Sequence, residues 1–154
     1  MKTIRIKKNI LKRNKEEADK IRNLLKEKDI FTVNLLGSPG AGKTTFLEKI
    51  LKEMGNKKKI AIIEGDLYTT RDALRLEKYS SQIIQINTEG ACHLEANMVR
   101  QALDRLDLTK IDLLIIENVG NLVCTASYDL GEDIKITILS VPEGSDKLLK
   151  YPHI

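Results

Sequence analysis

The chain of 154 residues contains no tryptophan, and aromatic side chains make up only 4% of it. Its core must therefore be built from isoleucine, leucine and valine, which is typical of a parallel sheet covered by helices. No apolar run approaches the length of a membrane span, and the first residues lack the apolar centre of a signal peptide. We therefore expect a cytoplasmic protein without a membrane partner.

Acidic residues are missing from positions 1–13, where six lysine and arginine side chains occur. A basic arm of this kind is one way to bind nucleic acid or an acidic partner. No aromatic residue is interleaved for base stacking, so we expect a solvated, partly mobile terminus and no nucleic-acid partner.

Cysteine is also scarce, with Cys92 and Cys124 as the two thiols. A structural disulfide between them is not expected in the cytoplasm. Buried thiols, metal ligands and redox groups remain the alternatives.

Residues 37–44 read Gly-Ser-Pro-Gly-Ala-Gly-Lys-Thr, a complete G-x-x-x-x-G-K-[ST] phosphate-binding loop. The run 31–36 before it is typical of a buried strand, and an apolar helical pattern follows it up to Met54. Glycines let backbone N–H groups face a phosphate chain, while Lys43 reaches the β- and γ-phosphates and Thr44 holds Mg²⁺. The residues expected to bind the nucleotide here are Gly37, Ser38, Gly40, Ala41, Gly42, Lys43, Thr44 and Thr45.

Strand and helix patterns alternate along the rest of the chain. Apolar strand runs occupy 59–64, 82–86, 112–117 and 134–141, and helical patterns occupy 14–28, 73–78 and 94–106. This alternation predicts an α/β fold with a mostly parallel sheet and helices on both faces, which with the loop is the P-loop NTPase fold. We divide the chain into a basic N-terminal arm and helix, 1–30, and a P-loop domain, 31–154.

Ligands of parallel sheets collect beyond the carboxyl ends of the strands, and polar segments follow several strands of this chain. Asp66 follows the second strand, where it can approach Mg²⁺ directly or through water; its alternative role is a helix cap. Thr69 and Thr70 are either hydroxyls that respond to the γ-phosphate or ordinary loop residues.

The segment 117–120 follows the fourth strand and has the shape of a D-x-x-G switch element, with Glu117 in place of aspartate. We expect Glu117 to position metal-bound water and the Gly120 N–H to contact the γ-phosphate. Lys43, Asp66 and Glu117 are thus the predicted catalytic residues. No Asn-Lys-x-Asp segment occurs within the chain, so these residues do not identify the nucleotide base.

Cys92 and His93 are adjacent at a junction between a loop and a helix, and Cys124 lies beyond the next strand. Thiolate and imidazole ligands together suit Zn²⁺ or Ni²⁺. Three ligands leave a tetrahedral site incomplete, and a symmetric dimer would complete it. The alternative is two buried thiols with an incidental histidine.

Four segments in this order resemble the HypB family, the nickel-incorporation GTPases of NiFe-hydrogenase maturation. They are Gly-Ser-Pro-Gly-Ala-Gly-Lys-Thr, Glu-Gly-Asp, Cys-His-Leu-Glu-Ala and Glu-Asn-Val-Gly-Asn-Leu-Val-Cys. Segments 129–132, 143–147 and 150–152 extend the resemblance, which covers about residues 31–152. The related urease-maturation GTPase UreG shares the phosphate loop but not the Cys-His-Leu element.

The resemblance implies a homodimer that GTP forms or tightens, with an interface metal site whose ligands fall on Cys92, His93 and Cys124. It also implies slow GTP hydrolysis coupled to nickel delivery. The implied partners are a hydrogenase maturation accessory protein and the hydrogenase large subunit. The implied cofactors are GTP and Mg²⁺ with Ni²⁺ or Zn²⁺.

Three departures from the family pattern stand out. Thr125 occupies a position where the family usually has proline, so we expect a looser metal loop. The Cys-rich N-terminal nickel motif and the His-rich stretch of some members are absent, so nickel storage is not implied. The guanine-reading segment is also absent, and we expect a domain that is incomplete at its C-terminus. The alternative functions are a P-loop kinase or ATPase for small metabolites and a non-catalytic metal-binding fragment.

Overall fold

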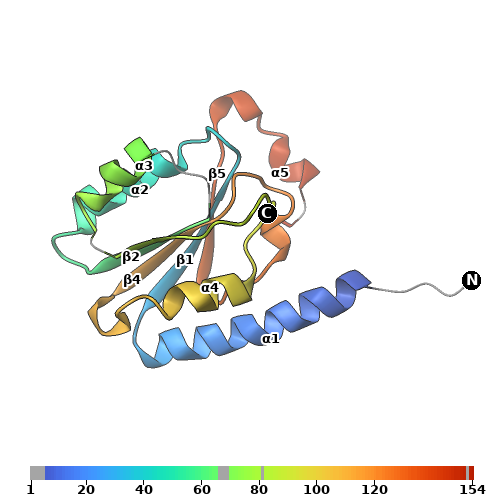
Figure 1. Cartoon of the computed structure of the whole chain (residues 1–154). Helices are drawn as coiled ribbons and strands as arrows, with labels where there is room; N and C mark the ends of the chain where they lie inside the picture. Colours follow the sequence, from blue (N-terminus) through green and yellow to red (C-terminus); the bar gives the residue numbers. More distant parts are fainter. Residues whose placement is uncertain (1–5, 66–69, 81, 152) are drawn as a thin grey trace, which may run out of the picture.

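The structure, a computed structural model, describes residues 6–65, 70–80, 82–151 and 153–154. In this part of the chain, parallel strands form one sheet in the order β3-β2-β4-β1-β5 (Figure 1). The strands are β1 (Phe31–Gly37), β2 (Ile60–Glu64), β3 (Ile83–Gln85), β4 (Leu113–Glu117) and β5 (Ile134–Ile138). The predicted α/β fold with a parallel sheet is confirmed.

Helices cover both faces of this sheet, as predicted. The first pair, α1 (Ile6–Glu27) and α4 (Ala96–Leu103), lies on one face, and the pair α2 (Lys43–Met54) and α3 (Thr70–Glu77) lies on the other (Figure 1). The short α5 (Lys147–Lys150) follows β5. Three 3₁₀ turns complete the described elements: η1 (Leu108–Lys110), η2 (Thr125–Ser127) and η3 (Val141–Glu143).

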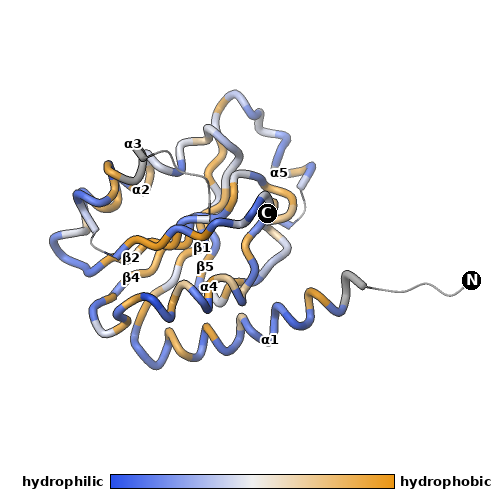
Figure 2. The backbone as a smooth tube through the Cα atoms, in the orientation of Figure 1, coloured by the Kyte–Doolittle hydropathy of each residue, from blue (hydrophilic) through white to orange (hydrophobic). Residues whose placement is uncertain are grey.

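The two faces of the sheet are built by alternation along each strand, because successive side chains of a strand point to opposite sides. In β2, Ala61 and Ile63 join the core cluster that includes α1 and α4, whereas Ile60 and Ile62 join the cluster that includes α2. Figure 2 shows the strands as apolar segments at the centre of the molecule and α1 as a helix of alternating character. Aliphatic side chains thus fill both layers of the core, as the scarcity of aromatic residues requires.

Helix α1 begins eight residues earlier than the pattern from residue 14 predicts, at Ile6 rather than Asn14. The predicted start of the helix is therefore wrong, while the expectation of a partly mobile terminus stays a prediction and residues 1–5 lie outside the described part. The reason is intrinsic propensity, since residues 6–13 contain three lysines, a leucine and an arginine and neither glycine nor proline. Farther along, Ala18, Ile21 and Leu25 are buried and hold the helix on the sheet.

Strand β5 ends at Ile138, three residues before the predicted end at 141. A capping box explains the difference, because the backbone N–H of Ser140 donates to Glu143 Oε2 at 2.6 Å and the chain turns into η3. Among the described residues, no helix has both the length and the apolar character needed to cross a bilayer.

Candidate functional site

The phosphate loop connects the end of β1 to the start of α2, as predicted. Gly40 has φ +76° and Gly42 has φ +103°, so both adopt backbone conformations that favour glycine. A Cβ on Gly37 would lie 3.1 Å from Cγ of Lys43, so glycine lets the lysine stem pass close to the loop. Lys43 is 5% exposed and its Nζ donates to the carbonyl of Gly37 at 3.0 Å.

A second lysine reaches the loop from the C-terminal segment of the described chain. Lys147 Nζ lies 3.4 Å from Ser38 Oγ and 2.7 Å from Glu143 Oε1. Lys147, Ser38 and the backbone N–H of Ser140 together lower the pKa of Glu143 from its usual 4.5 to about 2. Glu143 is therefore ionised at physiological pH, and its carboxylate holds the Lys147 ammonium beside the phosphate loop.

Glu117 ends β4 and is 1% exposed, at the same sheet edge as the phosphate loop. The sheet register places it opposite Leu35 of β1 on one side and opposite Glu64 of β2 on the other. Glu64 is fully buried, and it is a carboxylate that is not among the predicted site residues. Its signal in the sequence is an acidic residue that closes an apolar strand run directly before a glycine.

Mg²⁺ prefers carboxylate and hydroxyl oxygens, and this edge offers both kinds. Thr44 lies in the first turn of α2, and Glu64 and Glu117 end neighbouring strands. The residues present thus fit a hydrated Mg²⁺ ion. Asp66 and Thr69 lie outside the described residues, and so does the side chain of Thr70, so their predicted roles stay predictions.

The segment after β4 returns to the phosphate loop. Asn118 N–H donates to Leu35 O at 3.0 Å, and the backbone of Asn121 forms an antiparallel bridge with Gly37. The Gly120 N–H predicted to contact the γ-phosphate belongs to this segment, one residue before the bridge. The backbone of the predicted switch element therefore bonds to β1 just before the phosphate loop, and the residue that follows the element pairs with the first residue of the loop.

The three predicted metal ligands come together at the same sheet edge. One ligand atom each from Cys92, His93 and Cys124 lies within 4.8 Å of the others. Cys92 Sγ is 3.4 Å from His93 Nδ1. Hydrogen bonding to Cys124, together with burial and repulsion between the thiolates, raises the pKa of Cys92. Two thiolates beside each other are disfavoured, which a divalent cation between them would relieve.

His93 is fixed by neighbours that are not among the predicted site residues. Its ring stacks on Tyr128 with centroids 3.9 Å apart and an interplanar angle of 22°. Its Nε2 is buried and lies 3.4 Å from Glu95 Oε1 without forming a hydrogen bond. Burial, followed by the charges of Glu95 and the two cysteines, raises the pKa of Tyr128. The neutral phenol ring therefore forms one wall beside the imidazole.

Asn121 holds the loop that carries Cys124. Its Oδ1 accepts from the backbone N–H of Cys124 at 3.0 Å, and its Nδ2 donates to the carbonyl of Cys92. Thr125 is fully buried and donates from Oγ1 to the Asn121 carbonyl at 2.7 Å. Proline could not make this bond, so Thr125 anchors the loop rather than loosening it.

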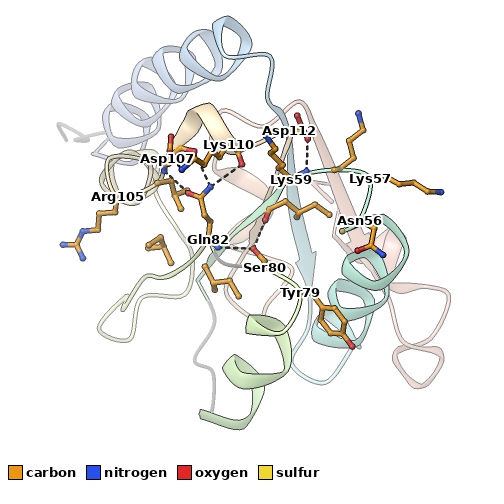
Figure 3. A pocket seen from close by; sticks show the side chains of 16 residues that line it. Asn56, Lys57, Lys59, Tyr79, Ser80, Gln82, Arg105, Asp107, Lys110 and Asp112 are labelled. Atoms are coloured by element: carbon orange, nitrogen blue, oxygen red, sulfur yellow. Dashed lines mark hydrogen bonds and ion pairs between the residues drawn. The ribbon is translucent and has the colours of Figure 1, made fainter.

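A cleft of 510 Å³ runs between the metal ligands and the switch segment. It is lined by Gly65, Thr88, Gly90, Ala91, Cys92, Val119, Gly120, Asn121, Val123 and Cys124. A larger hollow of 810 Å³ lies away from this edge, where Gln82, Ser80 and Asp107 form a hydrogen-bonded floor (Figure 3). None of the predicted site residues lines this larger hollow, so the volume of a hollow does not identify the candidate site in this protein.

The chain is similar in sequence to known proteins. Residues 31–144 match a family model described as CobW/HypB/UreG, nucleotide-binding domain. The chain is 47% identical over 98% of its length to the hydrogenase maturation factor HypB of Azotobacter vinelandii, of which the match covers 50%. The chain thus spans about half the length of such curated relatives.

Solved structures agree with the fold. HypB from Archaeoglobus fulgidus has a TM-score of 0.87 at 38% identity, over 94% of this chain and 70% of that one. HypB from Helicobacter pylori, solved in complex with nickel, has a TM-score of 0.83 at 47% identity, and the match covers 92% of this chain and 66% of that one. The predicted P-loop fold is therefore confirmed, and the chain belongs to the CobW/HypB/UreG nucleotide-binding family and, within it, to the HypB proteins.

Proposed function

We propose that the chain is a GTP-hydrolysing nickel metallochaperone that serves NiFe-hydrogenase maturation. The observation that carries this proposal is that the phosphate loop and the Cys92, His93 and Cys124 cluster share one sheet edge. The short segment from Glu117 to Cys124 joins them, with the end of β4 at one end and a metal ligand at the other. Relatives named as hydrogenase maturation factors, and a relative solved with nickel, support the same assignment.

The nucleotide side of the mechanism follows from the loop. Its glycines present backbone N–H groups to the β- and γ-phosphates, and Lys43 leaves the Gly37 carbonyl to neutralise them. Thr44 and Asp66 would hold Mg²⁺, which would neutralise charge on the phosphate oxygens when bound. Glu117 orients the attacking water, and the Gly120 N–H contacts the γ-phosphate in the triphosphate state alone.

Nickel is the cargo, and Zn²⁺ suits the same donors. Cys92 and Cys124 supply thiolates and His93 an imidazole nitrogen, all held by one sheet edge. A second copy related by a twofold axis would add an equal set and complete the coordination shell, which makes a homodimer part of the proposal. The partners would be a hydrogenase maturation accessory protein and the hydrogenase large subunit.

Cytoplasmic placement belongs to the same proposal, because two neighbouring thiols stay available for a metal only where they remain reduced.

The division into an N-terminal arm and helix, 1–30, and a P-loop domain, 31–154, also stays a proposal. Helix α1 buries Ala18 and Ile21 in the same core cluster as the sheet residues Ile63 and Leu114.

Nickel titration of single variants tests the metal assignment. Cys92→Ala, His93→Ala and Cys124→Ala should each abolish stoichiometric Ni²⁺ binding or weaken it by at least about tenfold, since even the loss of a residue that orients a ligand costs about 10- to 100-fold. Asn97→Ala is the matched control, since Asn97 is exposed on α4 and lies outside the cluster. Unchanged titration of Cys92→Ala would overturn the assignment.

Product analysis tests the nucleotide assignment. GTP incubated with the chain and Mg²⁺ should yield GDP and inorganic phosphate, and Lys43→Ala should abolish this activity while the fold is retained. Transfer of the phosphoryl group to a small metabolite would instead indicate a kinase. Equal turnover of ATP and GTP would remove the preference for guanine.

A further inference from the structure

We propose that Asn121 is the positioning residue through which the nucleotide state of the phosphate loop reaches the metal ligands. The inference rests on the function proposed above and adds the residue that couples its two halves. Asn121 is half-buried between the phosphate loop and the thiol-bearing loops, and it lines the cleft that contains both cysteines. Its backbone meets one site and its side chain meets the other.

The side-chain amide of Asn121 holds both cysteine-bearing segments at once. Its oxygen accepts from the N–H groups of Val123 at 3.1 Å and Cys124 at 3.0 Å. Its nitrogen donates to the carbonyl of Cys92, which lies 29 positions earlier in the chain. An amide offers a donor and an acceptor on one planar group, which neither a carboxylate nor a hydroxyl reproduces in this arrangement.

The backbone of Asn121 connects to the nucleotide site. It forms an antiparallel bridge with Gly37, the first residue of the phosphate loop. The Gly37 carbonyl accepts the Lys43 ammonium at 3.0 Å. A γ-phosphate that attracts Lys43 removes the bond between Lys43 and the Gly37 carbonyl, and Gly37 is the residue that pairs with Asn121. A contact between the γ-phosphate and Gly120 would in addition pull on Asn121, which follows Gly120 in the chain.

These two attachments make the separation of the thiols depend on the switch segment. A shift of the Asn121 backbone moves its amide, and the amide carries the Cys92 carbonyl and the Cys124 N–H with it. Metal affinity then differs between nucleotide states because the ligands are presented at different separations. By reciprocity, bound metal changes the affinity for the nucleotide by the same factor.

The test compares Ni²⁺ affinity in two nucleotide states for the wild-type chain, Asn121→Ala, Asn121→Asp and the control Asn97→Ala. Affinity is measured by titration of the thiolate-to-nickel absorption band, with Mg²⁺ and either GDP or a non-hydrolysable GTP analogue. Couplings between sites commonly change affinity by about 5- to 150-fold, and we expect the wild type and Asn97→Ala to show a ratio in this range.

Asn121→Ala should bind Ni²⁺ about 10- to 100-fold more weakly, the usual effect of losing a residue that orients metal ligands. Its ratio between the two nucleotide states should fall to near one, while its nucleotide affinity and melting temperature stay close to wild type. Asn121→Asp keeps the acceptor for Cys124 and loses the donor to Cys92, so its ratio should lie between those of the wild type and the alanine variant. A merely structural role would lower the melting temperature and leave the ratio intact.

The outcomes separate the inference from the proposed function on which it rests. If Asn121→Ala shows the same ratio of Ni²⁺ affinities between the two nucleotide states as the wild type, the inference is overturned. If the alanine variant does not fold, the same result in Asn121→Asp overturns it. A wild-type chain that binds Ni²⁺ with the same affinity in both nucleotide states also overturns it. A wild-type chain that binds no Ni²⁺ overturns the proposed function instead.

Discussion

Gly65→Ala should destabilise the protein and disturb the metal loop through one neighbour, Leu94. Gly65 follows β2, and its N–H donates to the Glu117 carbonyl at 2.8 Å. A Cβ at this position would lie 2.7 Å from both Cγ and Cδ1 of Leu94 and 2.9 Å from Cδ2. Carbon atoms prefer separations of about 3.5–4.0 Å, so Leu94 would have to move by about 1 Å.

Leu94 has little room for such a move. It is fully buried in the core cluster with α1 and α4, and its N–H donates to Asn118 Oδ1 at 3.2 Å. Overpacking of a filled core costs about 1–3 kcal/mol, and we expect Gly65→Ala to lose stability in this range. Because Leu94 directly follows Cys92 and His93, the displaced chain should also weaken Ni²⁺ binding.

A double-mutant cycle followed by urea unfolding and far-UV circular dichroism checks this reasoning. Leu94→Ala alone should cost about 2–5 kcal/mol, since it leaves a cavity. In the double variant Gly65→Ala/Leu94→Ala, the methyl group added at position 65 occupies the space that the Leu94 side chain has left. The loss of unfolding free energy should therefore be smaller than the sum of the two single losses by at least about 1 kcal/mol.

Leu103→Ala supplies the control, because Leu103 is buried in the same cluster and is not among the atoms nearest to Gly65. Its combination with Gly65→Ala should be additive within about 0.5 kcal/mol. An additive cycle with Leu94, or a Gly65→Ala variant as stable as the wild type, would refute the steric account.

Three further predictions concern other contacts. Gly131→Ala should lose about 1–3 kcal/mol to backbone strain at φ +86° and a similar amount to overpacking, since its Cβ would lie 2.6 Å from Ile21 Cγ2. Gly40→Ala, with φ +76° and nothing within 4 Å, should show the strain alone in the same urea assay. Asn118→Ala leaves the Leu94 N–H and the Asn34 amide with one partner fewer; it should cost about 1–3 kcal/mol and speed amide exchange at Leu94. The contact of Glu143 with Lys147 holds the folded-state pKa of Glu143 near 2 against a usual 4.5, so its stabilisation is present above pH 4.5 and lost as pH falls toward 2. Glu143→Gln should therefore flatten the decline of the urea midpoint below pH 4.5, and an unchanged slope would contradict this assignment.

The fold was readable from the sequence where local chemistry and strand order agree. The phosphate loop has a fixed spacing, and the apolar runs before and after it have the periods of a strand and a helix. Cys92 and Cys124 could be placed at one edge because each follows a strand of a parallel sheet, whose carboxyl ends lie together. The structure brings their ligand atoms within 4.8 Å of His93 as well.

The residues that support the site could not be found in this way. Glu64 faces Glu117 because β2 and β4 are neighbours in register, and no local pattern sets that pairing. Tyr128 stacks on His93 across 35 positions of sequence, and Asn121 reaches Cys92 across 29. Such contacts depend on how loops fold onto each other, which periodicity does not encode.

The stack of Tyr128 on His93 also gives this protein an optical reporter. The chain has four tyrosines and no tryptophan, so its near-ultraviolet emission comes from phenol rings alone. One of those rings lies 3.9 Å from the imidazole of the candidate metal cluster. Ni²⁺ is an efficient quencher at short range, so its arrival at the cluster should darken Tyr128. Loading and release of the metal can therefore be followed in real time on the unlabelled protein. Tyr128→Phe is the reference, because it lacks the ring that the metal should quench.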